Sequence, residues 1–146
     1  MFDEAPAVYR VIRVAKQLGH FLGDRLAPLG LHPGQERLLS ALWEEQGLSQ
    51  SELVERLSVQ PPTVTTALQR LERGGFVYRE LDAQNRRISR VYLTDKGRDC
   101  EAPVRALFAE AERVFLGDLS RAERARLVAM LDRVGPPARA RANLDA

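Results

Sequence analysis

Apolar residues recur every three or four positions near the beginning of the chain and in its last third, but the stretch from Phe76 to Leu93 follows a different pattern. Spacings of three and four place side chains on one face of a helix, whereas runs of β-branched and aromatic residues between polar stretches are typical of strands. The pattern therefore predicts a mainly α protein with a small β-hairpin, an α+β fold.

The first expected helix follows Pro6 and ends near Pro28. Its apolar positions are Val8, Val11, Ile12, Ala15, Leu18, Gly19, Leu22 and Leu26, with Val14 and Phe21 widening the stripe. The polar stripe is narrow and runs through Arg13, Lys16, His20 and Asp24. One neighbouring layer would not cover so much apolar surface, so this helix should contact a second surface such as a partner chain.

A second helix is expected to begin at Pro33, because proline suits a first helical position, and to stop at Gly47. Its buried side is expected to consist of Leu38, Leu39, Leu42 and Trp43. Ser49 and Glu52 then form a capping box, in which each side chain accepts a hydrogen bond from the backbone N–H of the other residue. This pair predicts the start of a short third helix that ends near Leu57.

A break at residues 58–60 separates the third helix from a fourth, whose first turn holds Pro61 and Pro62. The fourth helix is expected to bury Val64, Leu68 and Leu71 and to end at Gly74 and Gly75. After it, Phe76–Leu81 and Ser89–Leu93 predict a two-stranded hairpin with a charged tip.

Two further helices are expected after the hairpin. Thr94 and Asp95 should cap one long helix, and a second capping box at Ser120 and Glu123 should open the last one. From Pro136 onward the chain has few apolar residues, so a loose tail is expected there.

The length of 146 residues suits one compact domain with its own core and is too short for two ordinary domains. Hydrophobic and charged fractions of 45% and 29% are those of a soluble globular protein, and no apolar run approaches the ~20 residues that span a bilayer. Asp3, Glu4 and Pro6 stand where a signal peptide would be basic and apolar, so a cytoplasmic protein without a membrane partner is expected. The single cysteine, Cys100, is expected to be a small buried hydrophobe, and no metal ion or cofactor is expected.

The net charge of +2 says little about a nucleic-acid partner, but the distribution of charge says more. Between Gln60 and Arg98 there are eight basic and four acidic residues, so the remainder of the chain sums to −2. Nearly all of these basic residues are arginines, whose planar fork suits phosphates and guanine edges. The positive charge is therefore concentrated in one central segment.

A short capped helix, a tight break and a second helix with a thin apolar stripe are typical of a helix-turn-helix, in which the second helix enters the major groove of DNA. The outer face of such a helix carries small and hydrogen-bonding side chains. The fourth helix has them at Thr63, Thr65, Thr66, Gln69, Arg70 and Arg73. Ser49 and Ser51, at the start of the preceding helix, are also predicted to contact DNA. Taken alone, all of these residues are equally compatible with ordinary solvated helices.

The adjacent hairpin favours the DNA-binding interpretation. Arg86 and Arg87 at its tip could place a guanidinium in the narrow minor groove, where the negative potential is enhanced. A charged turn by itself is usually only solvated. Two helices followed by a hairpin, however, stand in the order of a winged helix-turn-helix.

These motifs resemble the MarR-type regulators of bacteria and archaea. The resemblance covers about Leu29 to Gly97, through the segments GLHPGQERLLSAL, LSQSELVERLSVQPPTVTTALQRLERGGFVYRELD and NRRISRVYLTDKG. It implies a wing contact at Arg87 and recognition-helix contacts at Pro62, Thr63, Thr65, Thr66, Gln69 and Arg70. Two positions depart from the family pattern. Asn85 stands where an aspartate commonly braces the wing arginine, and His32 stands where a serine or threonine often caps the second helix.

The resemblance also implies the organisation of the whole chain. Residues 1–146 would form a single MarR-like domain, with a DNA-binding lobe at 29–97 and a helical dimerisation lobe made of 7–28 and 98–135. The expected partners are a second copy of the chain and double-stranded DNA with a pseudo-palindromic operator. A small amphipathic or phenolic effector is expected between the lobes, with candidate contacts at Arg13, His20 and Trp43. Each of these three is also compatible with a plain solvated or core position.

The predicted function is that of a sequence-specific DNA-binding transcriptional regulator, a repressor released by a small-molecule effector. The alternative is a winged-helix protein-interaction module without specific DNA binding, because a fold does not determine function. An enzyme is not expected. His20 and His32 lie apart in the sequence, no glycine-rich phosphate loop is present, and no carboxylate pair stands out.

Overall fold

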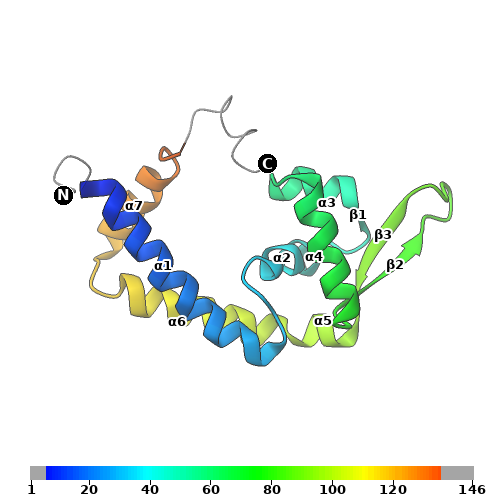
Figure 1. Cartoon of the computed structure of the whole chain (residues 1–146), viewed down its shortest axis with the longest axis horizontal. Helices are drawn as coiled ribbons and strands as arrows, with labels where there is room; N and C mark the ends of the chain where they lie inside the picture. Colours follow the sequence, from blue (N-terminus) through cyan, green and yellow to red (C-terminus); the bar gives the residue numbers. More distant parts are fainter. Residues whose placement is uncertain (1–5, 136–146) are drawn as a thin grey trace.

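The structure, a computed structural model, describes residues 6–135 and consists of helices with one small antiparallel sheet (Figure 1). The elements in chain order are α1 (Pro6–Leu26), the 3-10 helix η1 (Ala27–Leu29), α2 (Gln35–Glu44), β1 (Leu48–Ser49), α3 (Gln50–Leu57), α4 (Pro61–Arg73), β2 (Val77–Leu81), β3 (Ser89–Leu93), α5 (Asp95–Asp99), α6 (Glu101–Leu116) and α7 (Arg121–Leu131). The mainly α fold with a small sheet is therefore confirmed. The tail predicted from Pro136 onward lies outside the described residues.

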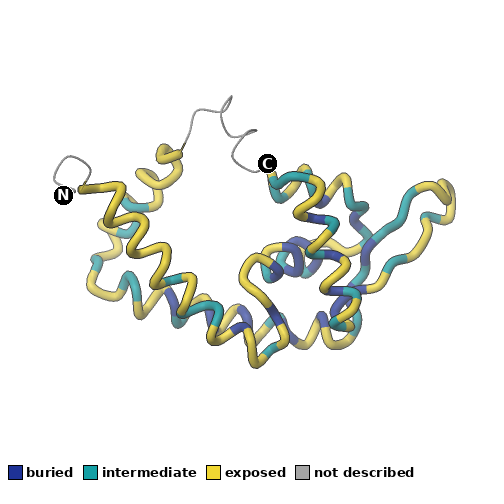
Figure 2. The backbone as a smooth tube through the Cα atoms, viewed as in Figure 1, coloured by how far each residue is buried: buried dark blue, intermediate teal, exposed yellow. Residues whose placement is uncertain are grey.

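The elements gather at two ends of the molecule. In Figure 1, α1 and α6 lie side by side and α7 is near the outer end of α1, whereas α2, α3, α4 and the sheet form the opposite end. Most of the buried segments in Figure 2 belong to this second end, and α1 is exposed along most of its length. The core residues there include Leu38, Leu39, Leu42, Leu53, Leu68, Leu71 and Phe76.

The sheet has one strand more than the predicted hairpin. The two residues of β1 pair with β3 in antiparallel register, Leu48 opposite Val91 and Ser49 opposite Arg90, which gives the order β1-β3-β2. The predicted hairpin is confirmed as β2 and β3, and β1 is an additional strand that was not predicted, because two residues are too short to show a periodic pattern. The extra strand ties the start of α3 to the base of the wing.

Two helix boundaries also differ from the prediction. The second helix begins at Gln35 and not at Pro33, because Gly34 adopts a left-handed φ of +97° immediately before it. The long helix expected after Thr94 is divided at Cys100 into α5 and α6. Pro103 has no N–H to donate to the carbonyl four residues earlier, so the helical ladder is interrupted at this point.

The end of α4 directs the chain straight into the wing. The N–H of Gly75 donates to the Glu72 carbonyl, and the N–H of Phe76 donates to the Leu71 carbonyl. These two bonds form a Schellman motif, which needs a left-handed residue just beyond the helix, and Gly75 has a φ of +77°. Phe76 is then buried and β2 follows at once.

Candidate nucleic-acid interface

The helix pair α3 and α4 has the local geometry that its sequence predicts. The Ser49 hydroxyl accepts from the Glu52 N–H at 3.2 Å, and the Glu52 carboxylate accepts from the Ser49 N–H at 2.7 Å, so the capping box is formed. Ser58 ends α3 with a left-handed φ of 52°. Leu53 of α3 and the apolar side of α4 are buried in the same core, which leaves the other side of α4 in solvent.

Most of the predicted contacts on α4 are exposed: Pro62, Thr63, Thr66, Gln69, Arg70 and Arg73. Thr65 is half-buried, donates to the Pro61 carbonyl at 3.0 Å and accepts from the Gln50 amide at 2.5 Å. Its hydroxyl therefore joins α4 to α3. On α3 itself, Ser51 is exposed.

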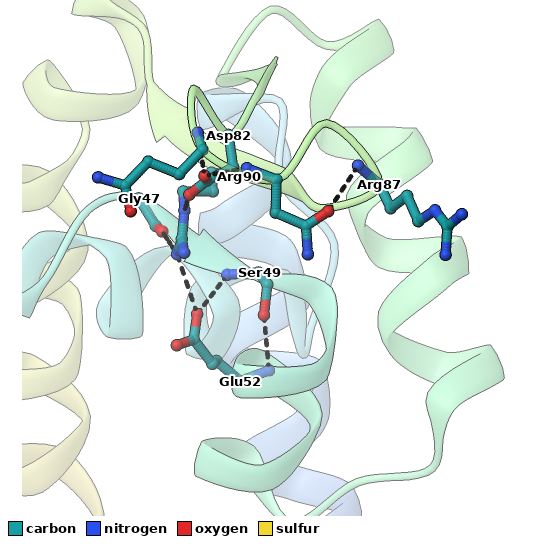
Figure 3. A network of polar contacts seen from close by, with 8 residues as sticks. Gly47, Ser49, Glu52, Asp82, Arg87 and Arg90 are labelled. Carbon is teal, nitrogen blue, oxygen red and sulfur yellow. Dashed lines mark hydrogen bonds and ion pairs between the residues drawn. The ribbon is translucent and has the colours of Figure 1, made fainter.

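The wing is a β2–β3 hairpin with Arg86 and Arg87 exposed at its tip. Asn85 accepts the backbone N–H of Arg87 at 3.2 Å through its side-chain oxygen. Asn85, which stands where the family commonly has an aspartate, therefore hydrogen-bonds to the backbone of the turn and not to the Arg87 guanidinium. Figure 3 shows the Arg87 side chain pointing away from the other labelled residues.

Arg90 connects the wing to the beginning of α3. Its Nε donates to Asp82 Oδ2 at 2.5 Å and its Nη1 donates to the Gly47 carbonyl at 2.9 Å. The same Nη1 lies 3.5 Å from the capping carboxylate of Glu52 (Figure 3). In the sequence, Arg90 is only one of eight basic residues between Gln60 and Arg98, because its partners come together only in the folded chain.

The contacts in this network shift the pKa values of Asp82, Glu52 and Arg90 in favour of their charged forms. The Arg90 guanidinium, together with the backbone N–H groups of Asn85 and Gln84, lowers the pKa of Asp82 to about 2. Hydrogen bonds from Ser49 lower the pKa of Glu52, and Asp82 raises the pKa of Arg90. All three groups are therefore charged at neutral pH.

The arginines of the central segment divide into two groups. Arg79, Arg90 and Arg98 each pair with a carboxylate, on Glu72, Asp82 and Asp95 respectively. Within residues 6–135, no ion pair holds Arg70, Arg73, Arg86 or Arg87. Among the described arginines of this segment, those without an ion pair thus lie on the exposed side of α4 and at the wing tip, the two places where a DNA-binding protein of this architecture needs positive charge.

The candidate effector residues lie in different places. Trp43 is half-buried and donates its indole N–H to the Gly97 carbonyl at 2.9 Å. Arg13 and His20 are exposed on α1. Across residues 6–135, no three His, Cys, Asp or Glu side chains are grouped closely enough to hold a metal ion. None of the helices in this part of the chain has both the length and the apolar character needed to cross a membrane.

The helix pair α3 and α4 is followed by a small sheet that carries the wing, and arginines without an ion pair lie on α4 and at the wing tip. These features define a winged helix-turn-helix. Comparisons with known proteins agree. The MarR family model matches residues 31–89. An HTH-type transcriptional repressor of Mycobacterium tuberculosis (strain ATCC 25618 / H37Rv) is 31% identical over 133 residues, which cover 91% of this chain and 96% of the relative.

Solved structures give the same result. The crystal structure of the transcriptional regulator SlyA has a TM-score of 0.79 and 28% identity, with 97% of this chain and 95% of that chain covered. A mutant MarR from E. coli in complex with operator DNA has a TM-score of 0.78 and 27% identity, with 93% and 99% covered. The chain belongs to the MarR family and is a transcriptional regulator, a class of proteins that are not enzymes.

Proposed function

We propose that the chain represses transcription by binding, as a homodimer, a pseudo-palindromic operator in double-stranded DNA. The observation that carries this proposal is the position of the four arginines between Gln60 and Arg98 that have no ion pair, on the exposed side of α4 and at the wing tip. The similarity to a named repressor and to a MarR structure in complex with operator DNA supports it. The residues proposed to contact DNA remain those of α4, of the wing tip and of the start of α3.

The exposed apolar surface supports the homodimer. Val8 and Ile12 of α1 are 60% and 52% exposed, and Val128 of α7 is 58% exposed. Large apolar side chains that are left this exposed on neighbouring helices suggest an interface. We therefore assign residues 7–28 and 98–135 to a dimerisation lobe and residues 29–97 to the DNA-binding lobe.

A two-fold axis between the copies would set the geometry of the operator. The two α4 helices would enter successive major grooves about 34 Å apart, one helical turn of DNA. Each half-site would then be read by one subunit, which is why the operator should be pseudo-palindromic.

A gel-shift series on the DNA upstream of the chain's own gene tests the proposal. We expect retardation that depends on sequence and weakens steeply with salt, because counterions are released when arginines neutralise phosphates. A protein-interaction module would show no difference between this DNA and a scrambled duplex of the same composition, and that result would overturn the proposal.

We further infer that a small amphipathic effector releases the operator. A cavity of about 360 Å³ lies between α2, α3 and α6, with Trp43, Val104 and Phe108 in its lining beside Arg37, Arg56 and Arg105. Two carboxylates, Glu36 and Glu44, also line the cavity, and this mixture of apolar and charged groups suits a small amphipathic molecule such as an aromatic carboxylate or a phenol. The lining includes the predicted Trp43 but neither Arg13 nor His20, whose role stays a prediction.

The place of this cavity explains how a ligand could affect DNA binding. Its walls come from α2 and α3 next to the recognition helix and from α6, which leads to the proposed dimer interface. A ligand that fits one spacing of these elements better than another shifts the DNA-ready population. Thermal-shift screening of aromatic carboxylates and phenols, followed by operator competition, tests this. Tight ligand binding with unchanged operator affinity would contradict it.

A further inference from the structure

Arg90 is the residue through which the wing turn and the start of α3 are joined. Its side chain is 30% exposed and lies on β3, with β2 on one side and β1 on the other. Nε donates to Asp82, and Nη1 donates to the Gly47 carbonyl and forms an ion pair with the Glu52 carboxylate (Figure 3). A lysine in this place could not make the same set of contacts, because one ammonium has no planar fork.

Each partner of Arg90 holds a different part of the DNA-binding lobe. Asp82 accepts the N–H groups of Gln84 and Asn85, at 2.8 and 2.9 Å, and so shapes the turn that carries the wing arginines. Glu52 belongs to the capping box that starts α3. The Gly47 carbonyl immediately precedes β1. One guanidinium therefore connects the wing turn to the helix pair.

We propose that Arg90 is a positioning residue for DNA binding. It holds the wing tip at a fixed place relative to α3 and α4, so that Arg87 reaches the minor groove while α4 occupies the major groove. Arg90 itself is not expected to contact DNA, since its Nε and Nη1 are directed to protein acceptors. This inference rests on the proposed DNA contact of Arg87.

A double-mutant cycle tests the inference. Arg90→Gln and Arg90→Lys are each made alone and together with Arg87→Ala, and operator affinity is measured for all variants. We expect each Arg90 variant to weaken binding about tenfold, as Arg87→Ala does, because each loses the same charge-assisted wing contact. In the Arg87→Ala background the Arg90 substitutions should then cost nothing further.

Two control variants separate positioning from charge and from folding. Arg98→Gln removes one positive charge and one ion pair, with Asp95 on α5, and should leave operator affinity unchanged. Glu52→Gln keeps an oxygen that can accept the Ser49 N–H but removes the charge beside Arg90, so it should weaken binding in the same direction even if Arg90→Gln folds poorly. Thermal unfolding of every variant verifies the fold.

Different failures have different meanings. Losses that add up in the double variants, or an Arg90→Lys variant that binds as tightly as the unmodified chain, would overturn the inference alone. A salt slope that falls by about one more on adding Arg90→Gln to Arg87→Ala would show a direct phosphate contact and would also overturn it. If Arg87→Ala itself had no effect, both the wing contact and the inference would fail, and absence of specific binding by the unmodified chain would overturn the proposed function.

Discussion

Gln69 and Arg87 are both exposed, but their chemistry predicts different effects on DNA binding. Gln69→Ala should cost ~1 to 3 kcal/mol mainly at one base position, because an amide can pair with an adenine edge. Arg87→Ala should weaken binding on all sequences and lower the salt slope by about one if the guanidinium meets backbone charge. Affinities measured on the operator, on its single-base variants and on random DNA at several salt concentrations distinguish the two. Equal losses on operator and random DNA for Gln69→Ala would exclude it from base readout.

Asp82 predicts a pH-dependent contribution to stability. Its pKa is lowered from 3.8 to about 2 in the folded chain, chiefly by Arg90. A carboxyl group whose pKa is lower in the folded state stabilises that state above its unfolded pKa, and the contribution is lost as the pH falls toward the folded pKa. Asp82→Asn should therefore lower the unfolding temperature at neutral pH, and the gap to the unmodified chain should narrow between pH 3.8 and about pH 2. Melting curves across this range check it, and a gap that stays constant would contradict the assignment.

At the scale of elements, the first turn of α3 offers a matched pair of serines. The Ser49 hydroxyl accepts a hydrogen bond from the Glu52 N–H, whereas Ser51, two residues later, is exposed. Ser49→Ala should destabilise the fold by about 1 kcal/mol, the usual cost of losing an N-cap. Ser51→Ala should change stability by less than about 0.5 kcal/mol, as surface substitutions usually do. Chemical denaturation of both variants measures the difference, and equal losses would show that the cap contributes nothing.

The elements that sequence predicted well depend on residues close together in the chain. A capping box needs only a serine and a glutamate three residues apart, and both boxes form, at Ser49 and at Ser120. The strand β1 depends instead on pairing with β3, about forty residues later, and two residues carry no pattern of their own. The division at Cys100 could have been predicted, because Pro103 lacks the donor that a continuous helix needs.

The same distinction applies to the site. The exposed side of α4 follows from helical periodicity, because the buried Val64, Leu68 and Leu71 recur along one stripe. Arg90 could not be singled out in this way, since its hydrogen-bond partners lie 8 and 43 residues away. Nothing in its neighbours along the chain distinguishes a network arginine from a DNA-contacting one. The sequence alone therefore could not show which arginines pair with a carboxylate and which do not, because the folded chain decides this.

At the scale of the whole molecule, the two ends of the chain have different kinds of surface. The end formed by α2, α3, α4 and the sheet has a buried core of its own, and its arginines without an ion pair are exposed. The α1 and α7 helices leave many apolar side chains exposed, and no residue of α7 is buried. A second copy that covers these helices would give α1 and α7 the core that a single chain lacks, so a substitution there should break the dimer and leave the fold of the DNA-binding lobe intact.

Ile12→Glu tests whether α1 lies in the dimer interface. Ile12 is 52% exposed in the single chain, so a glutamate there is tolerated in a monomer, but a carboxylate buried between two subunits would lack a partner. We expect sedimentation to show monomers at micromolar concentration and operator affinity to fall steeply, because the energy of the second half-site is lost with the second subunit. Gln17→Glu introduces the same charge at another exposed position of α1 and should leave both measurements unchanged. An Ile12→Glu variant that stays dimeric would place the interface elsewhere, and one that is monomeric yet binds the full operator as tightly as before would show that each winged lobe suffices alone.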